Sequence, residues 1–140
     1  RSFNLFVADN RDAFWLRSLG GASDSVELFK IPEGVSMLTA WDLNAAESTR
    51  TRHYLPLFQS AAAPEPETGD WRAWEDLMAC QDFEAGTGPA EAMLVTSGRG
   101  FGTLSSSLIA LEAPSESKTR NIWRFSANPG APGGYSDTPI

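Results

Sequence analysis

Residues 100–111 read Gly-Phe-Gly-Thr-Leu-Ser-Ser-Ser-Leu-Ile-Ala-Leu and carry the strongest fold signal in the chain. Gly100 and Gly102 give the backbone the freedom that a tight turn needs. The apolar run 108–111 is of a kind that the interior of a sheet buries. We therefore predict a turn that leads into a buried strand. The serines at 105–107 are expected to face alternate sides of that strand and to form local hydrogen bonds.

Upstream of this stretch, runs of aromatic and branched residues predict four strands before any helix, at residues 3–8, 13–16, 26–31 and 35–39. Residues 9–12, Asp-Asn-Arg-Asp, have turn chemistry. We therefore predict that the first two strands form a hairpin with its loop at this point.

A first helix is predicted to begin after Ser48, a residue type that caps helices well. Thr51, Leu55 and Phe58 would then share one face, because they are spaced by four and three residues. Pro56 should kink or shorten this helix, since proline lacks a backbone N–H group.

A second helix is predicted after Asp70, which we expect to act as its N-cap, and its apolar stripe would consist of Trp71, Trp74, Leu77 and Met78. Three further strands are expected, at 93–96, in the segment that follows a tight turn at 98–100, and at 122–125. The predicted order is four strands, two helices and three strands. This order belongs to the α+β class, in which helices cover an antiparallel sheet.

The 140 residues suit a single domain, 1–140, with a core of its own. A net charge of −7 provides no electrostatic footprint for nucleic acid. The one cysteine, Cys80, cannot form an internal disulfide, and no apolar run reaches the length of a membrane span or a signal-peptide core. We therefore expect no nucleic-acid partner, no membrane span and a reducing, cytoplasmic location.

Several segments resemble, in the right order, the NRDE family, also called the transport and Golgi organisation family. The anchors are Phe3-Asn4-Leu5 with Ala8-Asp9, then 31–34 with 37–39, and then 100–111. Residues 54–58 and 71–75 are similar to the versions found in alphaproteobacterial members. Asn10-Arg11-Asp12 spells three letters of the family's name motif, but its flanks match the middle of the family, so we interpret it as the hairpin loop.

The resemblance covers about residues 2 to 126 and only the second half of the family's domain. It implies that this chain is the C-terminal portion of an NRDE-family domain whose N-terminal half is missing. The chain begins at Arg1 inside an apolar strand pattern, which fits this expectation. The family is thought to adopt the four-layer αββα sandwich of the N-terminal-nucleophile hydrolases. This chain would then contribute part of each sheet and one helical layer, with the missing half as its partner.

In that class of hydrolase the nucleophile is the first residue of the mature chain, whose own α-amine acts as the base. This chain begins Arg1-Ser2, and Cys80 lies deep within it on a predicted helix. We interpret Cys80 as a small, half-buried apolar residue. Leu38-Thr39-Ala40 stands where many relatives have Leu-Ser-Asn, and Gly102-Thr103-Leu104 stands where many have Gly-Thr-Arg. The resemblance thus implies the loss of an oxyanion-binding amide and of a carboxylate-binding cation, so we assign no catalytic residue here.

Two functions remain. The first is a non-catalytic, intracellular protein that binds a small molecule, because members of the family have been linked to haem trafficking and to lipid and secretory homeostasis. Its candidate ligand-binding residues are Thr39, Ala40, Gly102, Thr103, Leu104 and Ser105. Haem is the candidate cargo, and no resident cofactor or metal is assigned. The alternative function is that of an amide hydrolase whose catalytic cysteine lies in the missing upstream segment.

His53, the single histidine, is expected on a solvated helix face beside Arg50 and Arg52.

Overall fold

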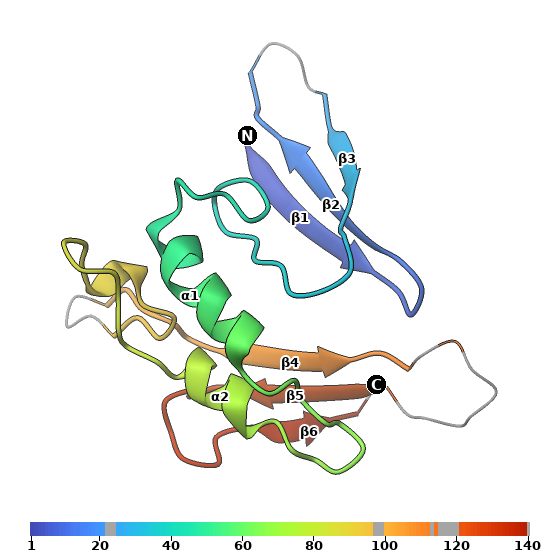
Figure 1. The fold of residues 1–140 in the computed structure, drawn as a ribbon, viewed down its shortest axis with the longest axis vertical. Coiled ribbons are helices and arrows are strands. Elements are labelled where there is room, and N and C mark those ends of the chain that lie inside the picture. The colour runs from blue at the N-terminus through green and yellow to red at the C-terminus, as the bar shows by residue number, and fades with distance from the viewer. Residues whose placement is uncertain (22–24, 97–99, 113, 115–120, 140) are drawn as a thin grey trace.

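The computed structural model describes residues 1–21, 25–96, 100–112, 114 and 121–139 (Figure 1). Within these residues the chain forms two three-stranded sheets, two α-helices and a short 3-10 helix. In chain order the elements are β1 (Phe3–Ala8), β2 (Ala13–Ser18), β3 (Glu27–Lys30), α1 (Thr49–Ser60), α2 (Arg72–Met78), the 3-10 helix η1 (Pro89–Glu91), β4 (Ser106–Ala110), β5 (Ile122–Ser126) and β6 (Ser136–Thr138). The predicted α+β class is confirmed.

Sheet one consists of β1, β2 and β3, paired antiparallel in that order. The predicted hairpin loop between β1 and β2 is confirmed. Oδ1 of Asp9 accepts hydrogen bonds from the backbone N–H groups of Arg11 at 2.8 Å and Asp12 at 2.9 Å. These bonds, the one from Asp12 above all, stabilise the carboxylate and hold the pKa of Asp9 below its ordinary value of 3.8. The loop is therefore fixed by its own side chain, as aspartate turns often are.

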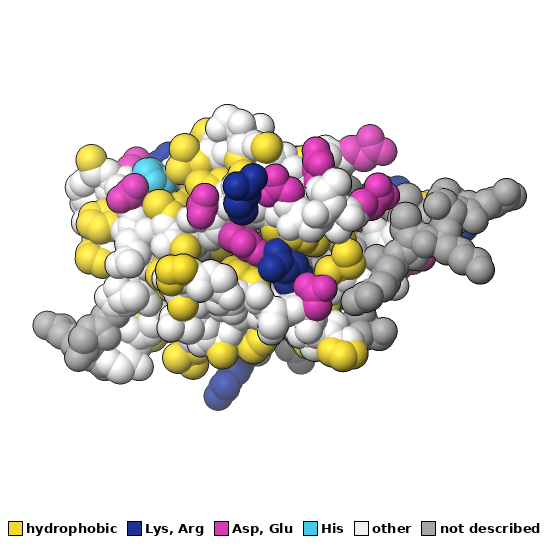
Figure 2. Space-filling model, turned by 90° about the horizontal axis from the view of Figure 1, so that it is seen from below, with side chains coloured by type: hydrophobic (Ala, Val, Ile, Leu, Met, Phe, Trp, Pro, Cys, Tyr) yellow, Lys and Arg dark blue, Asp and Glu magenta, His cyan; other side chains and the backbone are white. Residues whose placement is uncertain are grey.

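Sheet two consists of β4, β5 and β6, again antiparallel, with β5 at its centre. Strand β6 was not predicted, because it lies in a tail rich in proline and glycine. Arg124 of β5 pairs with Asp137 of β6 at 3.5 Å, and this ion pair anchors β6 to the sheet. The same guanidinium pairs with Glu75 of α2 at 2.5 Å. Figure 2, which views the molecule from below, shows basic and acidic side chains lying beside one another, with apolar side chains exposed around them.

Two predicted strands are corrected. Residues 35–39 are not a strand, because a loop uses their hydrogen bonds: Met37 N–H donates to Oδ1 of Asn44 at 2.7 Å, and Asn44 N–H donates to the carbonyl of Met37 at 2.8 Å. Residues 93–96 contribute only an isolated bridge between Thr96 and Gly102. The observed order of elements is therefore three strands, two helices and three strands among the described residues. The predicted turn at 98–100 falls largely outside those residues.

Helix α1 begins as predicted. The Ser48 hydroxyl accepts a hydrogen bond from the N–H of Thr51 at 3.1 Å and caps the helix. Thr51 and Phe58 are buried on one face together with Tyr54, whereas Leu55 is only half-buried. The expected shortening at Pro56 is wrong, since the helix continues to Ser60. Burial of the cap and of one face holds the helix together despite the missing N–H group.

Helix α2 begins one residue later than predicted, with Trp71 at its N-cap position. Asp70 still supports this end of the helix, because its Oδ1 accepts a hydrogen bond from the N–H of Arg72 at 3.2 Å. In Figure 1, α2 lies against sheet two and α1 runs above it, between the two sheets. The ion pair between Glu75 and Arg124 joins α2 to that sheet.

The core is centred on Tyr54, which is completely buried. Its hydroxyl donates to the carbonyl of Asp82 at 2.6 Å and accepts from the N–H of Met93 at 3.0 Å. Burial raises the pKa of Tyr54 to about 12. The other large core side chains are Trp15, Phe58, Trp71, Leu94, Val95 and Leu108. Most of this core is supplied by the helices, the segment 94–95 and sheet two, whereas sheet one supplies one large buried side chain, Trp15.

One face of each sheet is apolar and exposed. In sheet one, Leu5, Leu16 and Leu28 lie opposite one another across the three strands, and Leu5 and Leu28 are 48% and 61% exposed. We call this surface, with Phe3, Val7 and Phe14, the leucine face. In sheet two, Ile109 lies opposite Trp123 and is 61% exposed. No helix in the described part of the chain is long and apolar enough to cross a membrane.

Candidate functional site

The six candidate ligand-binding residues do not form one site. Thr39 and Ala40 line a depression beside sheet one. Gly102, Thr103 and Leu104 line a different depression, at the turn before β4. Ser105 is exposed and lines neither of the two. We call the first the N-terminal pocket and the second the glycine-turn depression.

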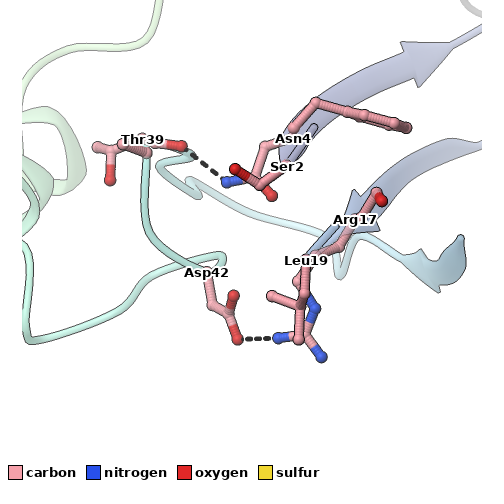
Figure 3. Close-up of a pocket in the computed structure, with 9 residues that line it drawn as sticks. Ser2, Asn4, Arg17, Leu19, Thr39 and Asp42 are labelled. Carbon is pink, nitrogen blue, oxygen red and sulfur yellow. Dashed lines mark hydrogen bonds and ion pairs between the residues drawn. The ribbon is translucent and has the colours of Figure 1, made fainter. Parts of the chain in front are cut away.

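The N-terminal pocket has a volume of about 340 Å³ and is built around Asn4 of β1 (Figure 3). The Asn4 amide donates at 3.0 Å to the carbonyls of both Thr39 and Trp41, and its oxygen accepts from the indole N–H of Trp15 at 3.0 Å. Asn4 therefore ties the loop that carries Thr39 and Ala40 to sheet one. Its polar atoms are already engaged in holding the pocket together.

Arg17 of β2 supplies the positive charge of this pocket, but two carboxylates neutralise it. It forms ion pairs with Glu27, at 2.8 Å, and with Asp42, as the dashed line in Figure 3 marks. The hydrogen bond with Asp42, followed by that with Glu27, raises the pKa of Arg17 above its ordinary value. The guanidinium also lies 5.4 Å from the ring centre of Trp15. This pocket therefore suits a neutral ligand that forms hydrogen bonds better than an anion.

The glycine-turn depression is wide, at about 600 Å³, and has an apolar rim. Leu104 is 82% exposed and Phe101 is 70% exposed. Gly100 has a positive φ of 79°, which L side chains rarely adopt. The hydroxyl of Thr103 accepts from the N–H of Val95 at 3.0 Å and donates to the carbonyl of Met93 at 3.2 Å, so it is occupied in fixing the turn.

The serines that follow behave as the alternation predicts. Ser106 is buried and accepts a hydrogen bond from the hydroxyl of Tyr135 at 2.6 Å. Ser107 is exposed and accepts one from the indole N–H of Trp123 at 3.2 Å. Both hydroxyls therefore stabilise sheet two.

Cys80 lies just beyond the end of α2 and is half-buried, and its backbone carbonyl accepts a hydrogen bond from the N–H of Leu94 at 2.9 Å. His53 is not on a fully solvated face, because it is half-buried with its ring edge against Tyr54, at 4.8 Å between ring centres. In the part of the chain that is described, no group of three or more His, Cys, Asp or Glu side chains could hold a metal ion.

A third cavity, of about 360 Å³, escaped the analysis of the sequence. It lies between the loop 35–39, the two helices and β4, and Thr39 lines both this cavity and the N-terminal pocket. Met37, Met78 and Met93, which are all the methionines of the chain, line it together. No sequence spacing connects these residues, because three separate segments supply them. We call it the methionine cavity.

The chain was compared with models of protein families, with curated proteins and with solved structures, and none of the three comparisons gave a match.

Proposed function

We propose that this chain is the C-terminal portion of an NRDE-type domain and binds a small apolar molecule, with haem as the candidate cargo, rather than breaking a bond. The observation that carries the proposal is the exposed apolar rim of the glycine-turn depression, where Leu104 is 82% exposed. Exposed side chains of this kind at a concave site favour a flat apolar ligand.

The chemistry of the candidate residues favours binding over catalysis. The Thr103 hydroxyl is held by two backbone groups, so it does not act as a nucleophile without breaking the turn. Cys80 follows 79 residues of chain and has no free α-amine to serve as a base. Leu104 stands where the resemblance implies an arginine, which replaces an anion-binding group with an apolar one.

The exposed sheet faces support the part of the proposal that concerns the missing half. The leucine face and the face around Ile109 are both apolar, and a monomeric protein rarely leaves such surfaces uncovered. In an αββα sandwich the inner faces of the sheets pack against further strands. An upstream half of the same domain would bury these side chains and complete the sheets.

Titration with haem tests the binding site. In the natural protein, with any sequence that flanks these residues, we expect Leu104→Arg to weaken haem binding by about tenfold, because it puts a charge where the ligand excludes water. Leu57→Arg is the matched control, since Leu57 is an exposed leucine on α1 that lines none of the three depressions. It should leave the affinity unchanged.

The same pair of variants is titrated with N-acyl amino acids, which are small and anionic. Here Leu104→Arg should strengthen binding, because arginine pairs well with carboxylates. Identical affinities of wild type and Leu104→Arg for every ligand would mean that this turn belongs only to the fold. Hydrolysis of an acyl amide by an upstream cysteine in the natural protein would favour the amide hydrolase instead.

A further inference from the structure

We propose that the methionine cavity is a binding site for an aliphatic carboxylic acid, with the chain against the methionines and the carboxylate between Trp74 and Arg50. The proposal does not depend on the family resemblance or on the glycine-turn depression, because it is carried by a different cavity. Thr39 is the one candidate residue that lines this cavity.

The wall of the cavity suits a flexible aliphatic chain. Methionine side chains are unbranched and polarisable, so they adjust to the shape of an apolar ligand. Here three of them converge from the loop at 37, the end of α2 at 78 and the segment at 93. Phe58 and Leu108, both buried in the core, also contribute to the apolar lining.

One polar atom in this wall lacks a partner. The indole nitrogen of Trp74 is buried and has no hydrogen-bond acceptor among the described residues. The Trp74 ring is held edge-on against Phe58, with 5.1 Å between the ring centres, and both rings line the cavity. A buried donor without an acceptor is costly, and the oxygen of a bound ligand would satisfy it.

Arg50 gives this cavity a positive charge that no described carboxylate balances. Its guanidinium donates to two neutral acceptors, the carbonyls of Ala90 at 2.6 Å and of Glu91 at 3.3 Å. The carboxylate of Glu91 instead accepts from the hydroxyl of Thr49 at 2.6 Å. By contrast, Arg52 on the same helix is paired with Glu84 at 2.7 Å. Arg50 is therefore fixed in place by the backbone and still available to an anion.

Apolar walls, one unpaired N–H donor and one unbalanced cation together select an apolar molecule with a carboxylate. A neutral alcohol would fill the same space without neutralising the charge of Arg50, and an amine would be repelled by Arg50. The chemistry is that of a medium-chain fatty acid, and decanoate is the probe, with decanol and decylamine as matched comparisons.

Calorimetric titration of the natural protein tests the site. We expect decanoate to bind at least about tenfold more tightly than decanol, because hydrogen bonds to charged groups are the stronger ones. Affinity should rise about fourfold for each methylene added to a shorter acid, until the cavity is full. Arg50→Gln should remove the preference for decanoate over decanol. Arg52→Gln is the matched control on the same helix and should preserve it.

Two further variants keep the test decisive if Arg50→Gln unfolds the protein. Trp74→Phe removes the indole N–H but retains an aromatic ring, and it should weaken decanoate more than decanol. Leu104→Arg, which alters the proposed haem site, should leave decanoate binding unchanged, so the two proposals fail separately. Equal affinities for decanoate and decanol in the wild type would overturn the inference. So would a full preference for decanoate in both Arg50→Gln and Trp74→Phe.

Discussion

The leucine face of sheet one exposes its large apolar side chains, whereas the helical core buries side chains of the same kind. On the leucine face, Leu5 and Leu28 are more than two-fifths exposed, whereas Tyr54 and Leu108 are buried between the helices and sheet two. The difference lies in what covers each surface, since α2 is joined to sheet two by the ion pair between Glu75 and Arg124, whereas the leucine face is exposed among the described residues. A sheet that exposes one apolar face gains little stability from the burial of that face. Its stability then depends mainly on the backbone hydrogen bonds between its strands.

Sheet one is joined to the rest of the molecule through polar contacts. Asn4 holds the loop at Thr39 and Trp41, and Arg17 pairs with Asp42 of the same loop. Exposed ion pairs of this kind contribute little to stability. The helical core is therefore stabilised by its own packing, whereas the leucine face of sheet one is left without an apolar cover among the described residues.

The largest expected effect concerns the unfolding of residues 1–140 in isolation, and it tests the contrast between the two regions. We expect residues 1–140 alone not to unfold as a cooperative monomer, because the leucine face would remain in water or drive association. Thermal unfolding followed by circular dichroism, together with sedimentation, measures both properties. A single cooperative transition from a monomer would show that sheet one needs no cover.

The next effect tests the core side of the comparison. Tyr54→Phe should destabilise the natural protein by about 2 kcal/mol, because it removes both part-buried hydrogen bonds that the Tyr54 hydroxyl forms with the backbone groups of Asp82 and Met93. Tyr135→Phe removes one hydrogen bond, to Ser106, and should cost less, about 1 kcal/mol. Urea denaturation gives both values. Equal losses for the two variants would mean that Tyr54 is not the centre of the core.

A smaller effect is expected at Cys80. Cys80→Ala should cost about 1 kcal/mol of stability through lost packing, because the side chain is half-buried. Haem and decanoate affinities should stay the same. If the natural protein hydrolyses an amide and Cys80→Ala reduces its turnover about a hundredfold with stability intact, Cys80 has a chemical role.

The smallest effect concerns the hairpin loop of sheet one. The pKa of Asp9 is lower in the folded protein, so its contribution to stability is complete above the ordinary value of 3.8 and is lost as the pH falls through the folded value. The natural protein should therefore lose more stability on acidification than Asp9→Asn does. Urea midpoints measured above and below this range compare the two. A larger loss in Asp9→Asn would reverse the sign of the argument.

Local signals in the sequence predicted the elements that depend on neighbouring residues. The cap at Ser48 and the hairpin loop at Asp9 each involve residues no more than three positions apart. The failures involve distant partners. Residues 35–39 lie in a loop because Asn44 takes their hydrogen bonds, and β6 forms because β5 pairs with it. Neither partner is marked by any pattern within the segment itself.

The candidate site was predicted less well for the same reason. Thr39 and Gly102 were expected near one ligand, and they line two different depressions. The methionine cavity was missed because Met37, Met78 and Met93 meet only in three dimensions. Strand β1 was predicted, because its run of aromatic and branched residues is a local signal.

The most direct test of the central claim is the reactivity of a thiol placed on the leucine face. Leu28→Cys, in a Cys80→Ala background, reports on the most exposed of the three aligned leucines. Alkylation by iodoacetamide is measured in residues 1–140 and in the natural protein. The proposed upstream half predicts rapid alkylation in the isolated chain and protection in the natural protein, because it would cover this face. Equally rapid alkylation in both would contradict it.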